Sequence, residues 1–506
     1  MKLISTTTRL ALLLLCCLMC FTCFAGCNND SGDPEKSSTP EEVTEAPGVT
    51  GALTDENGYK LDTVPTMNFG NDEITILCWN SESLEEFDAE FGESVIESSV
   101  FERDDAVEER LGIELTYEQT AGDSKNVTNY LRKVQAASDA GDSWDLIASY
   151  SRSAAVCASK GLFRDLSTLD NSYLDFTQPW WSQDLIEKTS IGSSFFLCTG
   201  DVSISLVQMI YCTYFNMDMI EQYELESPYD LVDSNEWTFE KMLSMTKNIY
   251  RDNNNSNRVD LGDTLGLVGA YYDYPALLHG CNVPIVERNA TGSFVLSSVY
   301  KGEKAMDIMR DLSDSISLCS AYVSDNSYNS DKMFKGAQAI FRVAASGYAL
   351  KSLSGVEFEY GCVPCPKYTA DQDRYYSTVR QPISIYGIMV REPDDRIARA
   401  TATLECLASE GYRTTTPVVF EESMKYLKAT SPEMSEMLQL IRDTAWFDFA
   451  RIYSEETKYV CDKPGYILRD EGSWETFVNG DLTNKVEPAI KDLCALLISN
   501  NRLSDK

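Results

Sequence analysis

The sequence has a single histidine, His279, among its 506 residues. Histidine is the commonest metal ligand and the usual general acid or base, so its scarcity argues against metal and acid–base chemistry. The sequence also lacks a G-x-S-x-G nucleophile motif, a phosphate-binding P-loop and a dinucleotide-binding glycine motif. We therefore expect no required cofactor, and any acid–base catalysis would have to use carboxylates.

Basic residues are few, with 43 Lys and Arg against 79 Asp and Glu, which gives a formal net charge of −36. Such a balance repels phosphates, nucleic acid and anionic lipid surfaces. It favours a neutral or cationic ligand, although a solvated acidic surface that only maintains solubility explains the charge equally well. We expect no nucleic-acid partner.

Cysteines do not form a disulfide framework. Of the sixteen, five lie in the first 27 residues, and the remaining eleven are an odd number without regular spacing. We expect buried, reduced thiols. Cys362 and Cys365 have C-x-x-C spacing, but they lack a second pair and a following helical pattern, so we assign them neither a metal nor a redox role.

Long apolar runs are absent except over residues 10–24, which follow Lys2 and Arg9 and are typical of a secretory signal peptide. The run ends in Phe-Ala-Gly-Cys, and these residues resemble the lipobox of bacterial lipoproteins. The resemblance implies that residues 1–26 are a signal peptide and that Cys27 carries acyl chains such as palmitate. The protein would then be anchored by lipid on the extracytoplasmic face of the cell membrane. A signal peptide without lipidation remains the alternative.

Residues 27–70 predict a disordered acidic linker. Residues 28–66 contain one aromatic residue, four prolines and nine acids against two bases, a composition that cannot repay the entropy of ordering. The folded part is therefore assigned to residues 71–506. With 43% hydrophobic residues in the whole sequence, this part can bury a large core.

Strand and helix patterns alternate at the start of the folded part. Strands are predicted over residues 74–79, 113–117 and 144–148, each followed by an amphipathic helix, and this order predicts a mainly parallel sheet covered by helices. The rest of the chain adds a run of consecutive helices broken at Gly411, Pro417 and Pro432. Further strands are predicted over residues 195–199, 206–215, 334–343 and 384–390, with a hairpin over 282–296.

Several segments then resemble one family in order along the chain. They include "WDLIASYSRSAAVCASKGLFRDLSTLD", "PWWSQDLIEKTSIGSSFFLCTGDVS", "MFKGAQAIF" and "GCVPCPKY". Together they resemble the extracellular solute-binding proteins, the lipid-anchored receptors of carbohydrate ABC importers, over essentially everything from Glu73 onward. The resemblance implies an α/β, two-lobed, periplasmic-binding-protein-like fold of type II. Each lobe would hold a mainly parallel sheet flanked by helices, with a helix-rich C-terminal part. The N-lobe would cover roughly residues 71–200 plus later segments, and the C-lobe roughly residues 201–450.

The same resemblance implies a monomeric receptor that captures a sugar or oligosaccharide between its lobes. It would close like a Venus flytrap and deliver the sugar to the membrane subunits of an ABC importer, without catalysis. A lipid-anchored glycan hydrolase that uses a carboxylate pair is the alternative, since the sequence has 79 acids from which a pair could come. An adhesin that binds the cell wall is a third class.

Candidate ligand-binding residues follow from the rule that ligands of open α/β sheets bind beyond the carboxyl ends of strands. Sugars also call for aromatic platforms with carboxylate, amide and arginine groups around them. From the predicted N-lobe strands the rule selects Trp79, Glu82, Tyr150, Arg152 and Asp201. From the other lobe we add aromatic residues and an arginine in loop-like surroundings, namely Tyr271, Tyr272, Arg380 and Trp446. Each tryptophan could instead pack in the core.

Residues 252–263 have the oxygen spacing of a calcium loop. The candidate ligands for a structural Ca²⁺ are Asp252, Asn254, Ser256, Arg258, Asp260 and Asp263. Asn257 stands where such a loop needs a left-handed residue. Ser256 replaces the usual carboxylate, and Asp263 replaces the usual bidentate Glu, so an asparagine-rich surface loop without metal is the alternative.

Overall fold

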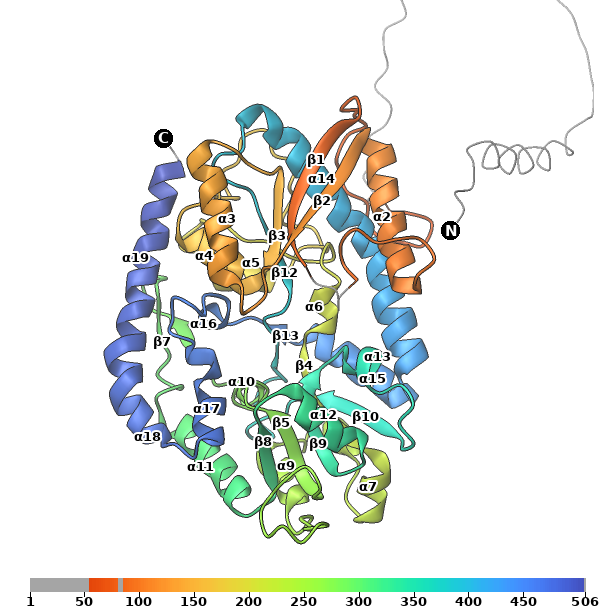
Figure 1. Ribbon diagram of the computed structural model, residues 1–506, viewed down its shortest axis with the longest axis vertical. Helices are drawn as coiled ribbons and strands as arrows, with labels where there is room; N and C mark the ends of the chain where they lie inside the picture. Colours follow the sequence, from red (N-terminus) through yellow and green to blue (C-terminus); the bar gives the residue numbers. More distant parts are fainter. Residues whose placement is uncertain (1–53, 81–84, 505–506) are drawn as a thin grey trace, which may run out of the picture. The chain divides into compact units, whose positions relative to one another are not determined.

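The computed structural model describes residues 54–80 and 85–504, and two sheets organise this part of the chain (Figure 1). In the first sheet β1 lies parallel to β2 and β3, while β12 is antiparallel to β3. Its strands, in spatial order, are β12 (Ser384–Gly387), β3 (Leu146–Tyr150), β1 (Asp72–Trp79) and β2 (Ile113–Thr120). The predicted parallel strands at the start of the folded part are therefore confirmed.

The second sheet is built from later strands. Its spatial order is β10 (Tyr360–Pro364), β4 (Tyr211–Asn216), β9 (Ala339–Ala345), β5 (Leu265–Ala270) and β8 (Ala321–Ser324). β5 lies parallel to β8 and β9, whereas β4 is antiparallel to β9 and β10. Two small ribbons pair β6 (Val286–Arg288) with β7 (Phe294–Leu296), and β11 (Ser377–Thr378) with β13 (Ala445–Trp446). The two-lobed α/β prediction is confirmed, and the hairpin within residues 282–296 is present.

Helices flank both sheets, and the chain after β12 is mostly helical (Figure 1). Those before β10 are α2 (Val95–Leu111), α3 (Val127–Ala140), α4 (Ser151–Ser159), α5 (Gln183–Thr189), α6 (Ser205–Gln208), α7 (Met217–Gln222), α8 (Pro228–Asp233), α9 (Phe239–Thr246), α10 (Pro275–Gly280), α11 (Glu303–Ser317), α12 (Ser327–Lys335) and α13 (Tyr348–Ser352). Those after β12 are α14 (Asp394–Glu410), α15 (Pro432–Asp443), α16 (Phe449–Ile452), α17 (Lys463–Arg469), α18 (Trp474–Phe477) and α19 (Glu487–Ser504).

Local sequence explains the first of these helices. Ser94 caps α2 by accepting a hydrogen bond from the backbone N–H of Glu97, and Gly112 ends the helix in the left-handed region at φ 59°. Val100, Val107 and Leu111 form the buried stripe between the two caps. β3 follows a different pattern, since all five of its side chains are buried, as expected for a central strand covered on both faces.

One predicted strand is wrong, and two others are wrong in part. Residues 195–199 form no strand, and their pairing is limited to one bridge between Cys198 and Tyr386. Residues 206–208 belong to α6, and residues 334–335 end α12, so the strands β4 and β9 begin later than predicted. Short apolar runs fit a buried helical turn as well as a strand, and periodicity alone does not separate the two.

The predicted helix breaks at Gly411 and Pro417 are also wrong. α14 continues directly into helical turns of wider spacing over Gly411–Thr415 and Val418–Lys428. Such π-type turns absorb a residue that a regular helix cannot fit. Gly411 is needed for packing, since a Cβ there would lie 2.2 Å from the carbonyl oxygen of Asp201. The break at Pro432 is confirmed, because that residue opens α15.

Residues 54–70, which the sequence assigned to the linker, lie against the folded part instead. Asp62 forms an ion pair of 2.6 Å with Arg110 of α2, and Val64 is buried. Further contacts hold the segment: the Val64 carbonyl accepts from Arg110 at 2.8 Å, and the Tyr59 ring lies 5.4 Å from that of Tyr412. Composition did not reveal these contacts because they depend on residues far away in the sequence. The rest of the predicted linker, and Cys27 with the signal peptide, lie outside the described residues.

Chain segments cross between the two sheets more than once. The segment before β4 and the segment before β12 run side by side, since Ile210 bridges Val379 and the backbone N–H of Arg380 donates to the Met209 carbonyl at 2.7 Å. The C-terminal helix α19 also contacts both parts. Asn500 donates to the Ser159 carbonyl of α4 at 2.9 Å, and Cys494 lies against the backbone of β7.

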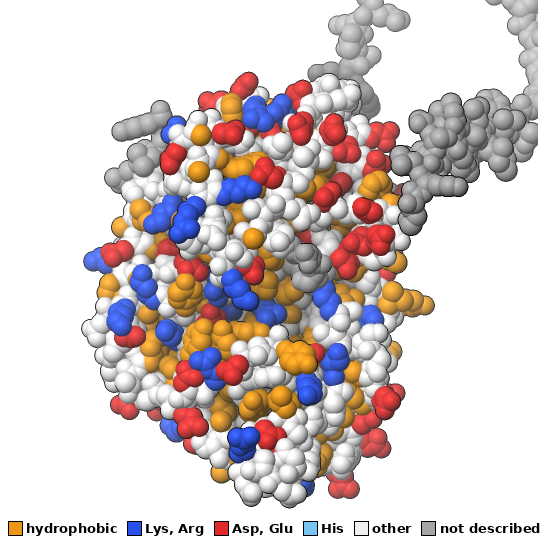
Figure 2. Space-filling model, viewed as in Figure 1, with side chains coloured by type: hydrophobic (Ala, Val, Ile, Leu, Met, Phe, Trp, Pro, Cys, Tyr) orange, Lys and Arg blue, Asp and Glu red, His pale blue; other side chains and the backbone are white. Residues whose placement is uncertain are grey.

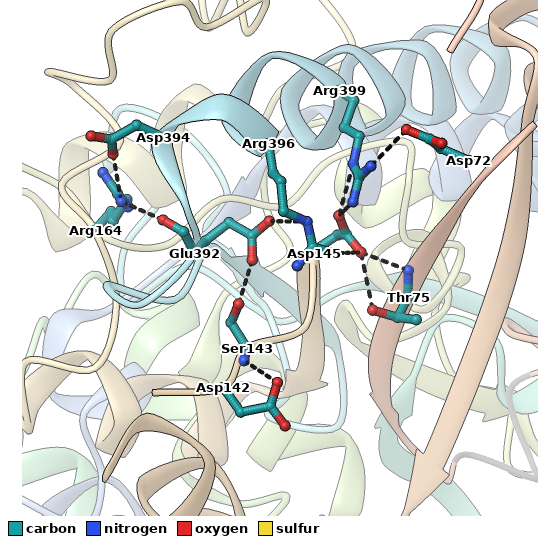
Figure 3. A network of polar contacts seen from close by, with 10 residues as sticks. All are labelled: Asp72, Thr75, Asp142, Ser143, Asp145, Arg164, Glu392, Asp394, Arg396 and Arg399. Carbon is teal, nitrogen blue, oxygen red and sulfur yellow. Dashed lines mark hydrogen bonds and ion pairs between the residues drawn. The ribbon is translucent and has the colours of Figure 1, made fainter. Parts of the chain in front are cut away.

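A buried carboxylate fixes the start of α14 on the first sheet (Figure 3). Asp145, which is fully buried, accepts hydrogen bonds from the backbone and the hydroxyl of Thr75 in β1, at 2.9 and 3.0 Å. It forms ion pairs with Arg396 at 2.9 Å and with Arg399 at 3.1 Å. One side chain thereby joins β1, β3 and a helix that is 250 residues away in sequence.

All eleven cysteines in the described part of the chain are unpaired, and ten of them are buried. The expected buried thiols are therefore present. Burial raises the pKa of Cys365 to about 12, which favours the protonated thiol.

The network around α14 contains a buried and an exposed carboxylate, and we expect their replacement to have very different effects on stability. We expect Asp145→Asn to lower the free energy of unfolding by about 3 kcal/mol, because it leaves two arginines without their buried partner. Asp394→Asn is the matched control, since the Asp394 side chain is 88% exposed and pairs with Arg164 at the surface; its cost should stay below about 1 kcal/mol. Urea unfolding of both variants measures the difference, and equal midpoints would contradict the assigned role of Asp145.

Candidate ligand-binding site

A cavity of about 810 Å³ lies where the carboxyl ends of strands from both sheets meet. Trp79 is the last residue of β1, Tyr150 is the last residue of β3, and Tyr271 directly follows β5. All three line the cavity, together with residues of the segment before β12 and of the C-terminal segment around α16 and α17. The rule for ligand sites in open α/β sheets thus holds for both sheets.

Aromatic side chains make up much of the lining. Trp79 and Tyr150 lie with their ring centroids 5.4 Å apart on one side, and Tyr271 stacks on Tyr466 at 4.5 Å on the other. The full aromatic set is Trp79, Tyr150, Tyr211, Tyr271, Tyr272, Tyr459 and Tyr466. Apolar ring faces with polar edges suit a ligand that has C–H faces and hydroxyl groups.

The Trp79 ring is held rigidly. It is 5% exposed, and its Nε1 donates a hydrogen bond to the Ser384 hydroxyl at 2.9 Å. Ser384 donates in turn to the buried carboxyl of Glu86, which also accepts from Ser205. Burial raises the pKa of Glu86. Because so little of Trp79 is exposed, removing the whole ring would cost stability as well as a ligand contact.

Arg152 organises the wall of the cavity. Its guanidinium forms an ion pair of 2.8 Å with Asp462 and donates through Nε to the Gln381 side chain at 2.9 Å. It lies 5.5 Å from the Tyr459 ring centroid. Three chain segments that are far apart in sequence therefore meet at one side chain, and its charge is largely compensated.

A glycine brings the C-terminal segment close to the second sheet. A Cβ at Gly465 in α17 would lie 1.6 Å from the carbonyl oxygen of Tyr271, so only glycine permits this approach. The contact places Tyr466, the next residue, on the Tyr271 ring. Burial raises the pKa of Tyr150 to about 12 and also raises that of Tyr271, so both hydroxyls stay neutral and can donate or accept hydrogen bonds.

A second cavity of about 340 Å³ adjoins the first, and Arg380 lines both. Its wall contains Arg342, which is held by Asp331 at 2.9 Å and by the Tyr348 hydroxyl at 2.7 Å. Figure 2 shows basic and hydrophobic side chains gathered across the middle of the molecule, where the surface is hollowed, while acidic side chains crowd its upper right. The basic and hydrophobic side chains of the hollow contrast with the acidic upper right of this face.

The structure brings six of the nine predicted ligand-binding residues to the first cavity. They are Trp79, Tyr150, Arg152, Tyr271, Tyr272 and Arg380. Glu82 lies outside the described residues. Asp201 and Trp446 lie elsewhere in the structure.

Asp201 lies in a separate cavity of about 240 Å³ beside Trp180 and Trp181. Burial raises its pKa to about 6, although Arg442 lies 3.5 Å away and acts in the opposite direction. It was selected because residues 195–199 were predicted to be a strand. Since they form no strand, the carboxyl-end rule does not apply there.

Trp446 packs in the core. It is 8% exposed, and its ring contacts those of His279 at 5.2 Å and Tyr376 at 6.0 Å. It belongs to β13, a two-residue strand that no periodic pattern marks in the sequence. Trp180 and Trp181 are also buried, and both donate through Nε1 to the Glu405 carboxyl at 3.0 Å.

Sequence reasoning missed much of the C-terminal wall. The lining residues that the sequence did not predict include Tyr211, Gln381, Arg451, Tyr459, Asp462 and Tyr466. The one local signal is Pro464-Gly465, which marks the start of a helix and a close approach of two backbones. Nothing in the sequence indicates that this segment returns to the strand ends.

The candidate calcium loop folds around its own side chains. Asp252 accepts hydrogen bonds from the backbone of Ser256 at 3.1 Å and of Asn257 at 2.9 Å. Asn257 has φ 55°, the left-handed conformation predicted for this position. Asp263 is fully buried, and its Oδ1 has no hydrogen-bond partner. Within residues 54–80 and 85–504, no group of three or more His, Cys, Asp or Glu side chains is arranged as a metal site.

The remaining loop contacts involve Asn254 and Asp260. The Asn254 amide donates to the Asp260 carboxylate at 2.8 Å, and the Gly262 backbone donates to the same oxygen at 2.9 Å. The side chain of Arg258 points to solvent, while its carbonyl accepts from the Ser256 hydroxyl at 2.8 Å. Any ligand from Arg258 would therefore be its backbone carbonyl.

Comparison with known families decides the broad assignment. The family model for bacterial extracellular solute-binding proteins matches residues 101–414. The chain belongs to this family. The predicted membership of the solute-binding family is thus confirmed. In the described part of this solute-binding protein, no helix has the length and apolar character needed to span a bilayer.

Solved structures share the fold of this solute-binding protein at low sequence identity. The cyclic alpha-maltosyl-1,6-maltose binding protein of Arthrobacter globiformis matches with a TM-score of 0.56 and 12% identity, over 84% of this chain and 99% of that chain. The galacto-N-biose-/lacto-N-biose I-binding protein of the Bifidobacterium longum ABC transporter, in complex with lacto-N-biose, has a TM-score of 0.51 and 10% identity, over 86% and 98% of the chains. An ABC substrate-binding protein of Listeria monocytogenes, in complex with cycloalternan, has a TM-score of 0.50 and 12% identity, over 85% and 98%. No curated protein sequence matches.

Proposed function

We propose that this solute-binding protein captures a sugar or oligosaccharide in the first cavity and delivers it to the membrane subunits of an ABC importer. The observation that carries the proposal is the cavity itself, which is lined by seven aromatic side chains from the strand ends of two sheets and from the C-terminal segment. The similar structures named above include complexes with lacto-N-biose and cycloalternan, which supports a sugar as the ligand class. A single chain provides both walls, so capture of the sugar needs no second copy of the protein, in line with a monomeric receptor.

Binding would close the lobes. A ligand shifts an open state to a closed state only by its differential affinity for the two, so it has to contact both walls. Trp79 and Tyr150 offer one surface, and Tyr271 with Tyr466 offers the other. Rotation about the segments that cross between the sheets would bring the two aromatic surfaces together.

A glycan hydrolase is the weaker alternative, because the carboxylates of the cavity are already engaged. Asp462 is paired with Arg152, and Asp470 with Arg469 at 2.7 Å. The arginine lowers the pKa of Asp470, whereas a glycosidase needs one carboxyl whose pKa is raised. Asp123 accepts hydrogen bonds from Lys125 and Asn126 in its own turn.

The sugar-binding proposal is tested by calorimetry and thermal shift of the full-length protein against mono- and oligosaccharides. A glycan that binds only the folded state adds about 2.7 kcal/mol of stability at a concentration of about 100 Kd. Tyr466→Ala should weaken that binding about fivefold, the loss expected for one aromatic contact. Tyr426→Ala is the matched control, since Tyr426 is 82% exposed and does not line the cavity. Release of shorter sugars during incubation would support the hydrolase, and no binding by any glycan would contradict the proposal.

Membrane attachment is a further part of the proposed function. The lipobox-like residues before Cys27 support acylation of this cysteine after removal of residues 1–26, which would place the receptor on the extracytoplasmic face. We expect metabolic labelling with a palmitate analogue to mark the wild type. Cys27→Ala should lose the label and leave the membrane fraction, whereas Cys319→Ala, a control outside the signal region, should keep both properties. Equal labelling of the Cys27 variant would rule out this site.

We also propose that residues 252–263 bind a structural Ca²⁺. The support is the left-handed Asn257 and the buried, unpartnered Oδ1 of Asp263, an oxygen that a hard cation would satisfy. Calcium at millimolar concentration should release heat and raise the melting temperature of the wild type. Asp252→Asn should reduce both effects, while Asp230→Asn on α8 should leave them unchanged. Absence of heat in the wild type would mean that the loop is an ordinary surface turn.

A further inference from the structure

The first cavity holds more basic charge than its own acids neutralise. Its lining contains three arginines and one lysine against three aspartates. Of the aspartates, Asp462 forms an ion pair with Arg152. Asp470 forms an ion pair with Arg469, which does not line the cavity. Among residues 54–80 and 85–504, this leaves the guanidinium groups of Arg380 and Arg451 without an acidic partner within ion-pair distance.

Arg380 presents its guanidinium to the cavity without a polar partner. Its backbone is fixed by the hydrogen bond to Met209, and its side chain lies over the Tyr272 ring at 5.0 Å. In the described part of the chain, this guanidinium forms neither a hydrogen bond nor an ion pair. The buried carboxyl of Asp273 acts on it electrostatically but does not reach ion-pair distance. A guanidinium stacked on an aromatic face keeps its edge N–H groups free for a ligand.

Arg451 lies beneath the same wall. It is 2% exposed, it lies 5.8 Å from the Tyr211 ring, and its Nε and Nη2 have no hydrogen-bond partner among the described residues. Asp448 and Asp462 act on it only at longer range. An arginine stays protonated in proteins, and a buried charge without a partner is costly. The cost falls if a ligand brings a negative charge to this wall.

We propose that the bound solute is an acidic sugar, an oligosaccharide with a carboxylate that Arg380 binds at its fork of N–H groups and that Arg451 stabilises from below. The inference rests on the proposed sugar-binding function and names the chemical class of its ligand. Planar guanidinium groups match a carboxylate with two parallel hydrogen bonds, which a neutral hydroxyl cannot accept in the same way.

This inference reverses the expectation drawn from net charge. A charge of −36 spread over the surface favours neutral or cationic ligands at long range. Exposed charges farther away than about 8 Å are largely screened at physiological salt, whereas charges inside a cavity are screened much less. The two unpaired arginines therefore determine the local preference for the ligand.

The experiment compares charged and uncharged forms of the same sugars. Oligomers of galacturonate, glucuronate and mannuronate are titrated into the full-length protein by calorimetry, each beside its methyl ester, which keeps the ring stereochemistry and removes the charge. We expect at least one acid to bind about tenfold or more tightly than its ester, as for a charge-assisted hydrogen-bonded pair. Raising the salt from about 50 mM to about 500 mM should leave the binding of the ester unchanged and the preference for the acid largely intact, because charges inside a cavity are screened much less than exposed ones.

Variants assign the effect to Arg380. Arg380→Gln should remove the preference for the acid over its ester, and Arg132→Gln, an exposed arginine on α3, should retain it. If Arg380→Gln fails to fold, Arg380→Lys keeps the charge without the fork and should lose part of the preference. Equal binding of acid and ester, or binding of neutral glycans alone, would overturn the acidic-sugar inference while sugar binding stands. Acid binding that Arg380→Gln leaves intact would overturn the role of Arg380. If no glycan binds at all, the proposed sugar-binding function itself is contradicted.

Discussion

The backbone pairing between the two crossing segments is the constraint on which the cavity depends. Ile210 and Val379 form a bridge, and the Arg380 N–H donates to the Met209 carbonyl. These contacts set the distance at which the two sheets face each other, and they hold Arg380 by its backbone at the junction of two cavities. A rotation of the lobes needs changes at only a few backbone angles in such segments. Arg380 would then keep its place while the aromatic walls move toward it.

The C-terminal segment supplies the part of the cavity wall that the two sheets do not form. Gly465 allows α17 to touch the backbone of Tyr271, and Arg152 ties this segment to the end of β3 through Asp462. The helix α19 then contacts α4 of the first part and β7 of the second. The C-terminal part of the cavity wall is thus held by packing of Gly465 against Tyr271 and by an ion pair between residues 310 positions apart.

The first sheet was predictable because its residues carry local signals. Ser94 and Gly112 mark the ends of α2, and the apolar run before Trp79 marks β1, so the strand-end rule correctly placed Trp79 and Tyr150 beside the cavity. Asp201 was misplaced because the apolar residues before it resemble a strand but pair only once. Arg451 and Tyr466 gave no signal, since a side chain that reaches a site by tertiary packing leaves no periodic pattern in its own segment. The unpaired arginines could not be recognised from charge counts, because pairing depends on distance.

The eleven unpaired thiols affect how the protein can fold outside the cytoplasm, where the proposed function places it. The native packing keeps ten of them away from oxidants, but a chain that has crossed the membrane unfolded exposes all of them at once. Thiol oxidation and folding then compete, and a mispaired bridge would block the packing of buried strands such as β4 and β10, which carry Cys212 and Cys362. The lifetime of the unfolded chain after export, rather than the stability of the native state, would therefore determine how much active receptor accumulates in an oxidising environment.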